Sequence, residues 1–241
     1  MEIINGVEIM DSALLIEKRI LIIADLHMGY EEALNKQGIL IPRNQFKETE
    51  KKLNELFIKL EKIKLEAIVI NGDLKHEFGK ISEQEWNETK KVLELLKKHC
   101  KNIILIRGNH DKILDPIANK NKLKIVDYYI VNGKEKMAII HGNKIFDSSE
   151  IKTAETLIIG HEHPAISLEE GPKRETYKCF LLGKWGKQKL IVMPSFLPII
   201  EGSDIRKEKL LSPYLKQKMG NFEIFVVGDK IYRFGKLKGI K

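Results

Sequence analysis

The chain has 241 residues, of which 43% are hydrophobic and 32% are charged, so the composition excludes a disordered chain and fits a single domain over residues 1–241. Apolar runs such as residues 20–24 have strand length, far below the roughly 20 residues that span a bilayer, so we expect no membrane partner. The opening residues lack the basic and apolar regions of a secretory signal, which predicts a cytoplasmic protein.

The positive charge is concentrated in the last part of the chain. Residues 170–241 carry 16 Lys or Arg against 7 Asp or Glu, whereas residues 1–169 have a net charge of −1. Basic surfaces bind the phosphate backbone of nucleic acid. However, 36 of the 42 basic residues are lysines set among glutamates, which is also typical of a thermophile-like surface. Both interpretations stay open.

Hydrophobic patterning in the first half predicts strands that alternate with helices. Ser82 and Glu85 form a capping box, which marks the start of one predicted helix. The predicted strands here are 13–17, 19–24 and 66–70, and the predicted helices are 44–63 and 82–99.

Strands dominate the second half. An Asn132-Gly133 turn separates two apolar runs and predicts a hairpin. The strand predicted at 102–106 completes the alternating first part, and the other predicted strands are 136–140, 156–160, 177–182, 189–193, 222–227 and 230–234. The order of elements indicates an α/β protein.

Polar residues directly follow five of the predicted buried strands, and these segments contain five of the seven histidines. The carboxyl ends of strands converge on the ligand crevice of open α/β sheets, so we expect these side chains to meet in one site. The segments are Asp-Leu-His at 25–27, Gly-Asp at 72–73, Gly-Asn-His-Asp at 108–111, His-Gly at 141–142 and Gly-His-Glu-His at 160–163.

The ordered series of segments resembles the calcineurin-like metallophosphoesterase superfamily. It is most similar to the archaeal phosphoesterases related to SbcD and to the double-strand-break repair nucleases, because His76 in GDLKHE stands where many phosphatases have an aspartate. Residues 193–205, MPSFLPIIEGSDI, are also similar to that archaeal group. The resemblance implies an α/β fold with mixed sheets, arranged as a four-layer α/β/β/α sandwich.

The same resemblance implies a centre of two divalent metal ions held by seven side chains. One ion would be bound by Asp25, His27, Asp73 and His163, and the other by Asp73, Asn109, His141 and His161. A shared anionic ligand is needed because two dications about 4 Å apart repel by about 17 kcal/mol at an effective dielectric of 20. Mixed imidazole and carboxylate ligands favour Mn, our first choice, and also Fe, Zn or Ni.

The implied reaction is hydrolysis of a phosphodiester substrate by in-line attack of a metal-bridging hydroxide. The resemblance places His110 near the leaving group as proton donor, with Asp111 orienting its other ring nitrogen. It also assigns His76 to contact a substrate phosphate. A histidine between Lys75 and Glu77 is equally typical of a polar surface loop.

Three functions remain as hypotheses. The leading one is hydrolysis of phosphodiester bonds in nucleic acid or nucleotides. A small-molecule nucleotide phosphodiesterase or phosphatase is the alternative, because 241 residues leave little room for the extra DNA-binding and partner-binding segments of related nucleases. A noncatalytic scaffold of the same fold is disfavoured, since all seven ligand positions are filled. The sequence does not identify any protein partner.

Overall fold

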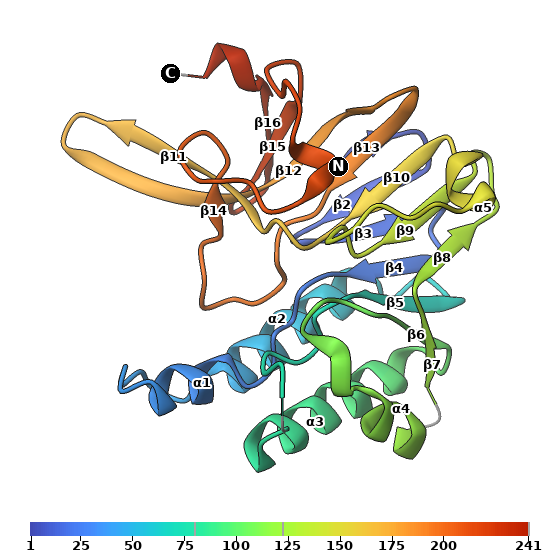
Figure 1. Ribbon diagram of the computed structural model, residues 1–241, viewed down its shortest axis with the longest axis vertical. Helices are drawn as coiled ribbons and strands as arrows, with labels where there is room; N and C mark the ends of the chain where they lie inside the picture. The colour runs from blue at the N-terminus through green and yellow to red at the C-terminus, as the bar shows by residue number, and fades with distance from the viewer. Residues whose placement is uncertain (80, 122, 241) are drawn as a thin grey trace.

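The computed structural model describes residues 1–79, 81–121 and 123–240. Over these residues the strands form two sheets, one of seven and one of nine strands. The longer helices lie along one side of the molecule and the second sheet forms the other side (Figure 1). The α-helices are α1 (Tyr30–Lys36), α2 (Gln45–Lys59), α3 (Glu83–His99), α4 (Asp115–Asn121) and α5 (Ser149–Lys152).

The first sheet joins an antiparallel meander to a parallel half. Strands β1 to β4 pair antiparallel, and β4 to β7 pair parallel, with α2 and α3 connecting successive parallel strands. Its strands, in spatial order, are β1 (Glu2–Ile4), β2 (Val7–Met10), β3 (Ala13–Ile16), β4 (Ile20–Ile23), β5 (Ala67–Asn71), β6 (Ile103–Ile106) and β7 (Lys124–Val126).

The second sheet has a parallel centre, in which β10 lies between β9 and β13. Strand β12 is long enough to pair with β11, β13 and β15. The strands are β8 (Tyr128–Val131), β9 (Met137–Ile140), β10 (Thr156–Ile159), β11 (Pro164–Glu170), β12 (Lys173–Trp185), β13 (Gln188–Val192), β14 (Ser203–Asp204), β15 (Glu223–Val227) and β16 (Ile231–Lys236).

Three apolar clusters fill the spaces between the layers. One packs α2 and α3 against the first sheet, through side chains such as Leu53 and Leu93. A second lies between the two sheets, where Ile22 of β4 and Ile158 of β10 belong to one cluster. The third covers the outer face of the second sheet and includes Tyr214. Apolar packing therefore holds the two sheets against each other.

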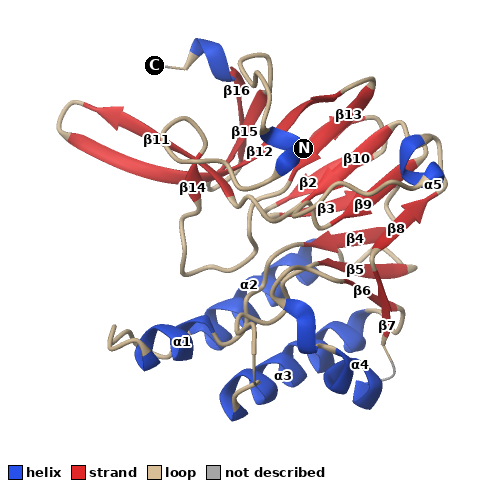
Figure 2. Cartoon of the chain, in the orientation of Figure 1, coloured by secondary structure: helices blue, strands red, loops and turns tan. Residues whose placement is uncertain are grey.

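The expected four-layer sandwich is confirmed, with one difference in its outer layer. Figure 2 shows that the long helices cover only the first sheet. The second sheet is covered instead by α5, by the 3-10 helix Pro213–Leu215 and by neighbouring loop segments. Within the described ranges, no helix combines the length and the apolar character needed to cross a membrane.

The predicted helices 44–63 and 82–99 correspond to α2 and α3. The Ser82 hydroxyl caps α3 by accepting a hydrogen bond from the backbone N–H of Glu85 at 3.1 Å. Patterning missed strands and helices that are short or mix polar with apolar residues, namely β1, β2, β7, β11, β14, α1, α4 and α5.

Candidate metal centre

Polar side chains from both sheets meet where the parallel strands end. The strands β4, β5 and β6 end at the same edge of the first sheet because they are parallel neighbours, and β9 and β10 do the same in the second sheet. The side chains carried just beyond these ends are Asp25, His27, Asp73, Asn109, His110, His141, His161 and His163. The structure thus brings the five sequence segments together.

The backbone at this edge is strained. A left-handed conformation costs a residue other than glycine roughly 1 to 2 kcal/mol, and such strain is concentrated at functional sites. Positive φ angles occur at Asp25 (54°), His27 (45°), Asp73 (46°), His161 (68°) and His163 (50°). Hydrogen bonds offset part of this cost, since the N–H of His161 donates to Asp25 Oδ2 at 3.0 Å.

One group of candidate ligands consists of Asp25, His27 and His163. The Nε2 atoms of the two histidines are 3.2 Å apart, and His163 Nε2 lies 3.5 Å from Asp25 Oδ1. Asp25 is fully buried, and its Oδ1 has no hydrogen-bond partner among the described residues. Burial and the neighbouring His163 lower the pKa of His27 to about 3, so its ring is neutral at pH 7. A buried carboxylate oxygen without a hydrogen-bond partner, in a group with two imidazoles, fits a metal cation.

The second group consists of Asp73, His141 and His161, with Asn109 beside it. His141 Nε2 lies 3.2 Å from Asp73 Oδ2 and 3.0 Å from Asn109 Oδ1. Burial and the nearby His141 lower the pKa of His161 to about 4. Burial also disfavours charge on His141, but its hydrogen bond to Asp73 prevails and raises its pKa to about 9. The donor set therefore suits a metal ion that displaces this proton.

Asp73 lies between the two groups. Its Oδ2 is 3.2 Å from Nε2 of His141 and 3.8 Å from Nε2 of His27. Its Oδ1 accepts a hydrogen bond from the N–H of His110 at 2.9 Å. One carboxylate oxygen is thus oriented by the backbone, while the other faces both groups.

Glycines in the motifs leave room for these ligands. A Cβ atom at Gly72 would lie 2.1 Å from Nδ1 of His141, and one at Gly108 would lie 2.1 Å from Oδ1 of Asp73. Both distances are too short for any side chain. Gly72 and Gly108, which precede Asp73 and Asn109 in the sequence, are therefore each required by a ligand that follows another strand.

His110 and Asp111 are close to the site, but their contacts differ from the expectation. The Nδ1–H of His110 donates to the carbonyl oxygen of His76, which takes the place of the expected contact with Asp111. The buried Asp111 carboxylate accepts from the N–H of Gly108 at 3.0 Å and lies 3.4 Å from the N–H of Lys75. Asp111 therefore binds the backbone of its own loop and of the neighbouring loop that carries His76, instead of orienting the His110 ring, and both buried amides gain an acceptor.

His76 lies inside the site instead of on an open surface loop. Its Nδ1 is 3.4 Å from Nδ1 of His27, and its ring centroid is 5.1 Å from that of His110. Burial, together with the nearby His110, lowers the pKa of His76 to about 4. The Glu85 carboxylate accepts from the N–H of His76 at 2.8 Å and so fixes this loop to α3.

These residues open onto a cleft of about 300 Å³. Its apolar walls come from Tyr30, Ile200 and Leu211, which sequence reasoning missed because they lie outside the polar motifs. Glu162 also lines it and accepts from the N–H of Ser212 at 2.7 Å. Glu162 could have been predicted as a residue of the cleft, because it lies between His161 and His163 in the sequence.

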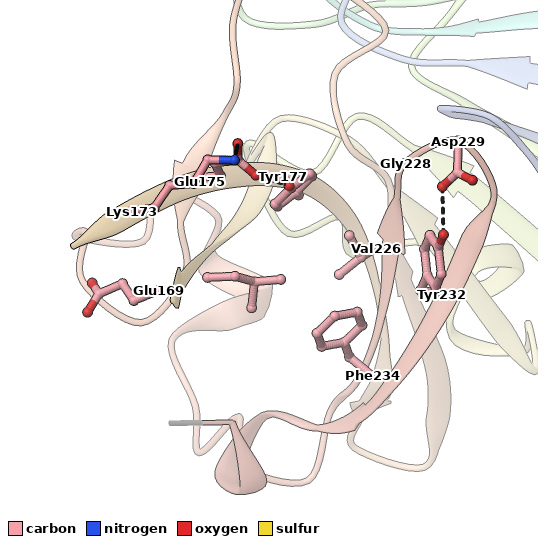
Figure 3. Close-up of a pocket in the computed structure, with 10 residues that line it drawn as sticks. Glu169, Lys173, Glu175, Tyr177, Val226, Gly228, Asp229, Tyr232 and Phe234 are labelled. Atoms are coloured by element: carbon pink, nitrogen blue, oxygen red, sulfur yellow. Dashed lines mark hydrogen bonds and ion pairs between the residues drawn. The ribbon is translucent and has the colours of Figure 1, made fainter. Parts of the chain in front are cut away.

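A second cavity, of about 390 Å³, lies between the β11–β12 hairpin and the β15–β16 hairpin. Tyr177, Tyr232 and Phe234 contribute to its lining, and Tyr232 donates a hydrogen bond to Asp229 at its rim (Figure 3). No candidate metal ligand lines it among the described residues. The candidate ligands His27, Asp73, Asn109, His161 and His163 line the cleft at the strand ends instead.

The sequence model of the calcineurin-like phosphoesterases matches residues 18–161. A nuclease of Pseudomonas putida, MPE, has a similar structure at 20% identity and a TM-score of 0.64, with 94% of this chain and 93% of that chain covered. The phosphoesterase Yfce of E. coli aligns at 16% identity and a TM-score of 0.44, over 87% of this chain and 88% of that chain. The search of curated proteins returned no match.

Proposed function

The chain belongs to the calcineurin-like phosphoesterase family and is a metal-dependent phosphoesterase, and from this premise we propose that it cleaves phosphodiester bonds with two divalent ions. The observation that supports two ions most strongly is the position of Asp73. One of its carboxylate oxygens faces a histidine from each ligand group, at 3.2 and 3.8 Å.

We assign Asp25, His27, Asp73 and His163 to one ion, and Asp73, Asn109, His141 and His161 to the other. The donors are mostly imidazoles with two carboxylates and one amide, which favours Mn first, then Fe, Zn or Ni, over Mg or Ca. Bound there, the ions would activate a water molecule for in-line attack and neutralise charge that develops on the phosphoryl oxygens.

His110 is proposed as the proton donor to the leaving group. Its Nδ1–H is held by the His76 carbonyl oxygen, so Nε2 is the nitrogen left to carry the proton that is transferred. Asp111 supports this role indirectly by binding the N–H of Gly108. His76 lines the same cleft and is proposed to contact a phosphate oxygen of the substrate.

The substrate is proposed to be a nucleotide or a nucleic acid, with a small-molecule phosphate ester as the alternative. A nuclease of Pseudomonas putida shares the fold, which makes single-stranded DNA one substrate to test. The cleft itself is small, and its walls include Tyr30 and the half-buried Ile200. A wall of this kind suits a flat or apolar group beside the phosphate.

The test is a substrate screen on protein stripped of metal and then loaded with Mn, Zn, Ni or Mg. The substrates are a nitrophenyl phosphodiester, a nitrophenyl phosphomonoester, nucleotides, and labelled single- and double-stranded DNA. We expect hydrolysis of the diester with Mn and none in the metal-free protein. Equal activity with and without metal would contradict the proposal.

A further inference from the structure

The turn Ser195–Leu197 lies at the junction of the two sheets. It follows β13 in the second sheet, where the N–H of Met193 still donates to Ile159 of β10 at 2.8 Å. The N–H of Phe196 then donates to the carbonyl oxygen of Ala24, just beyond β4 in the first sheet, also at 2.8 Å. The turn therefore joins the strand ends from which the candidate ligands extend.

Ser195 contacts the backbone of a candidate ligand directly. Its hydroxyl donates to the carbonyl oxygen of Asp25 at 2.7 Å and accepts from the N–H of Leu197 at 3.1 Å. Ser195 is only 1% exposed, so water does not compete for this bond. The hydrogen bond acts at a residue whose φ of 54° is strained, and it helps to hold that conformation.

Lys178 also binds the turn. Its Nζ atom donates to the carbonyl oxygen of Ser195 at 2.8 Å and also to that of Leu197. The lysine thus binds both ends of the turn, while the Ser195 hydroxyl is directed to Asp25. Burial lowers the pKa of Lys178 well below its ordinary value, and its two hydrogen bonds favour one conformation of the turn.

We propose that Ser195 is a positioning residue for the metal centre, which sets the Asp25 carboxylate against His163 across the two sheets. This ligand group combines Asp25, which follows a strand of the first sheet, with His163, which follows a strand of the second. His163 Nε2 and Asp25 Oδ1 are 3.5 Å apart, so a small shift between the sheets changes this distance. Removing the hydroxyl leaves the Asp25 carbonyl without this donor and lets the carboxylate relax. This inference rests on the proposed two-metal function.

The test compares Ser195→Ala with Ser195→Thr, which keeps the hydroxyl, and with Ser167→Ala as the control. Ser167 is equally buried, but its hydroxyl bonds Thr176 on the β11–β12 hairpin. Mn²⁺ binding to the metal-free chains is measured by competition with a chelating dye, beside the thermal midpoint. We expect Ser195→Ala to weaken one of two binding steps by roughly 10- to 100-fold, the usual effect of losing support behind a ligand.

Ser195→Thr should restore the affinity of that step, and Ser167→Ala should leave both steps unchanged. If Ser195→Ala weakens both steps equally, or only lowers the thermal midpoint as Ser167→Ala does, the positioning role is wrong. If Ser195→Ala fails to fold, Ser195→Cys, which keeps the size but donates weakly, must show the same selective loss. If the wild-type chain binds no Mn²⁺, the proposed function is overturned as well. If the wild type binds Mn²⁺ and Ser195→Ala binds it with the same affinity, only this inference is overturned.

Discussion

His141 Nε2 lies 3.2 Å from Oδ2 of Asp73, although the two residues follow strands of different sheets. The same oxygen lies 3.8 Å from His27, a member of the other ligand group. If Asp73 is shared by two ions, its loss must affect both, because the repulsion between the two dications is no longer offset.

We therefore expect Asp73→Ala to lower the metal content from two ions per chain to less than one. Hydrolysis should fall by on the order of 10³-fold or more, since several kcal/mol of transition-state stabilisation come from the ions. Elemental analysis and diester hydrolysis measure the two effects. Asp147→Ala, at a side chain that is 90% exposed, is the matched control and should change neither. Two tightly bound ions in Asp73→Ala would refute the shared ligand.

His110→Ala should keep its metal ions but lose the protonation of the leaving group. We expect a rate loss of roughly 10²- to 10⁴-fold with an alkyl phosphodiester, whose leaving group needs a proton. The loss should be much smaller with a nitrophenyl ester. His99→Ala is the control, because that ring stacks on Phe57 at the end of α3, away from the site. Equal losses with both esters would remove His110 from the acid role.

Gly108→Ala should disturb the centre although it removes no ligand. The added Cβ would lie 2.1 Å from Oδ1 of Asp73, so the carboxylate has to move. We expect loss of bound metal and a less stable metal-free protein, by roughly 1 to 3 kcal/mol, as for other overpacked sites. Gly239→Ala is the control, since nothing lies within 4 Å of its added Cβ. Normal metal content in Gly108→Ala would contradict this close approach.

Asp111→Asn tests the role of the buried carboxylate through pH. Burial and the neighbouring Asp73 raise the pKa of Asp111 from 3.8 to about 6. Because the pKa is raised in the folded state, the contribution of Asp111 to the free energy of unfolding is fully present below pH 4 and is lost as the pH rises through 6. A shift of about two pKa units corresponds to a loss of about 3 kcal/mol. Urea unfolding of metal-free protein should therefore show Asp111→Asn gaining stability relative to wild type between pH 4 and 7. Parallel pH profiles would contradict the raised pKa.

Sequence reasoning could predict the site because each ligand follows a buried strand, and buried strands are recognisable from apolar runs. It could not predict the hydrogen-bond partner of the His110 ring. That partner is the backbone carbonyl oxygen of His76, which no side-chain motif encodes. The apolar wall residue Leu211 was missed for a similar reason. It comes from a loop whose path depends on tertiary contacts, such as its N–H bond to Glu162.

The basic C-terminal part of the chain gives the last prediction. Lys184 lies near the end of β12, and Lys187 lies in the turn between β12 and β13, at the amino end of β13. Because β13 is parallel to β10, whose carboxyl end leads to His161, this turn lies at the opposite edge of the sheet from the cleft. At about 3.3 Å per residue, the strand separates the two by roughly 15 Å. These lysines are therefore too far away to hold the phosphate that is cleaved.

We expect charge reversal by Lys184→Glu and Lys187→Glu to leave the hydrolysis of a nitrophenyl diester and of a short single strand unchanged. The neighbouring Lys189 already pairs with Glu135 at 2.6 Å, so it is left unaltered in this variant. Binding of labelled single-stranded DNA to metal-free protein is titrated at several salt concentrations. The slope of log K against log salt concentration should be the same in variant and wild type. If the turn contacts the phosphate backbone, the variant should instead show a flatter slope, by about 0.7 for each phosphate contact that it loses. That outcome would mean that the strand extends across the sheet to the far edge, and it would favour nucleic acid over a small ester as the substrate.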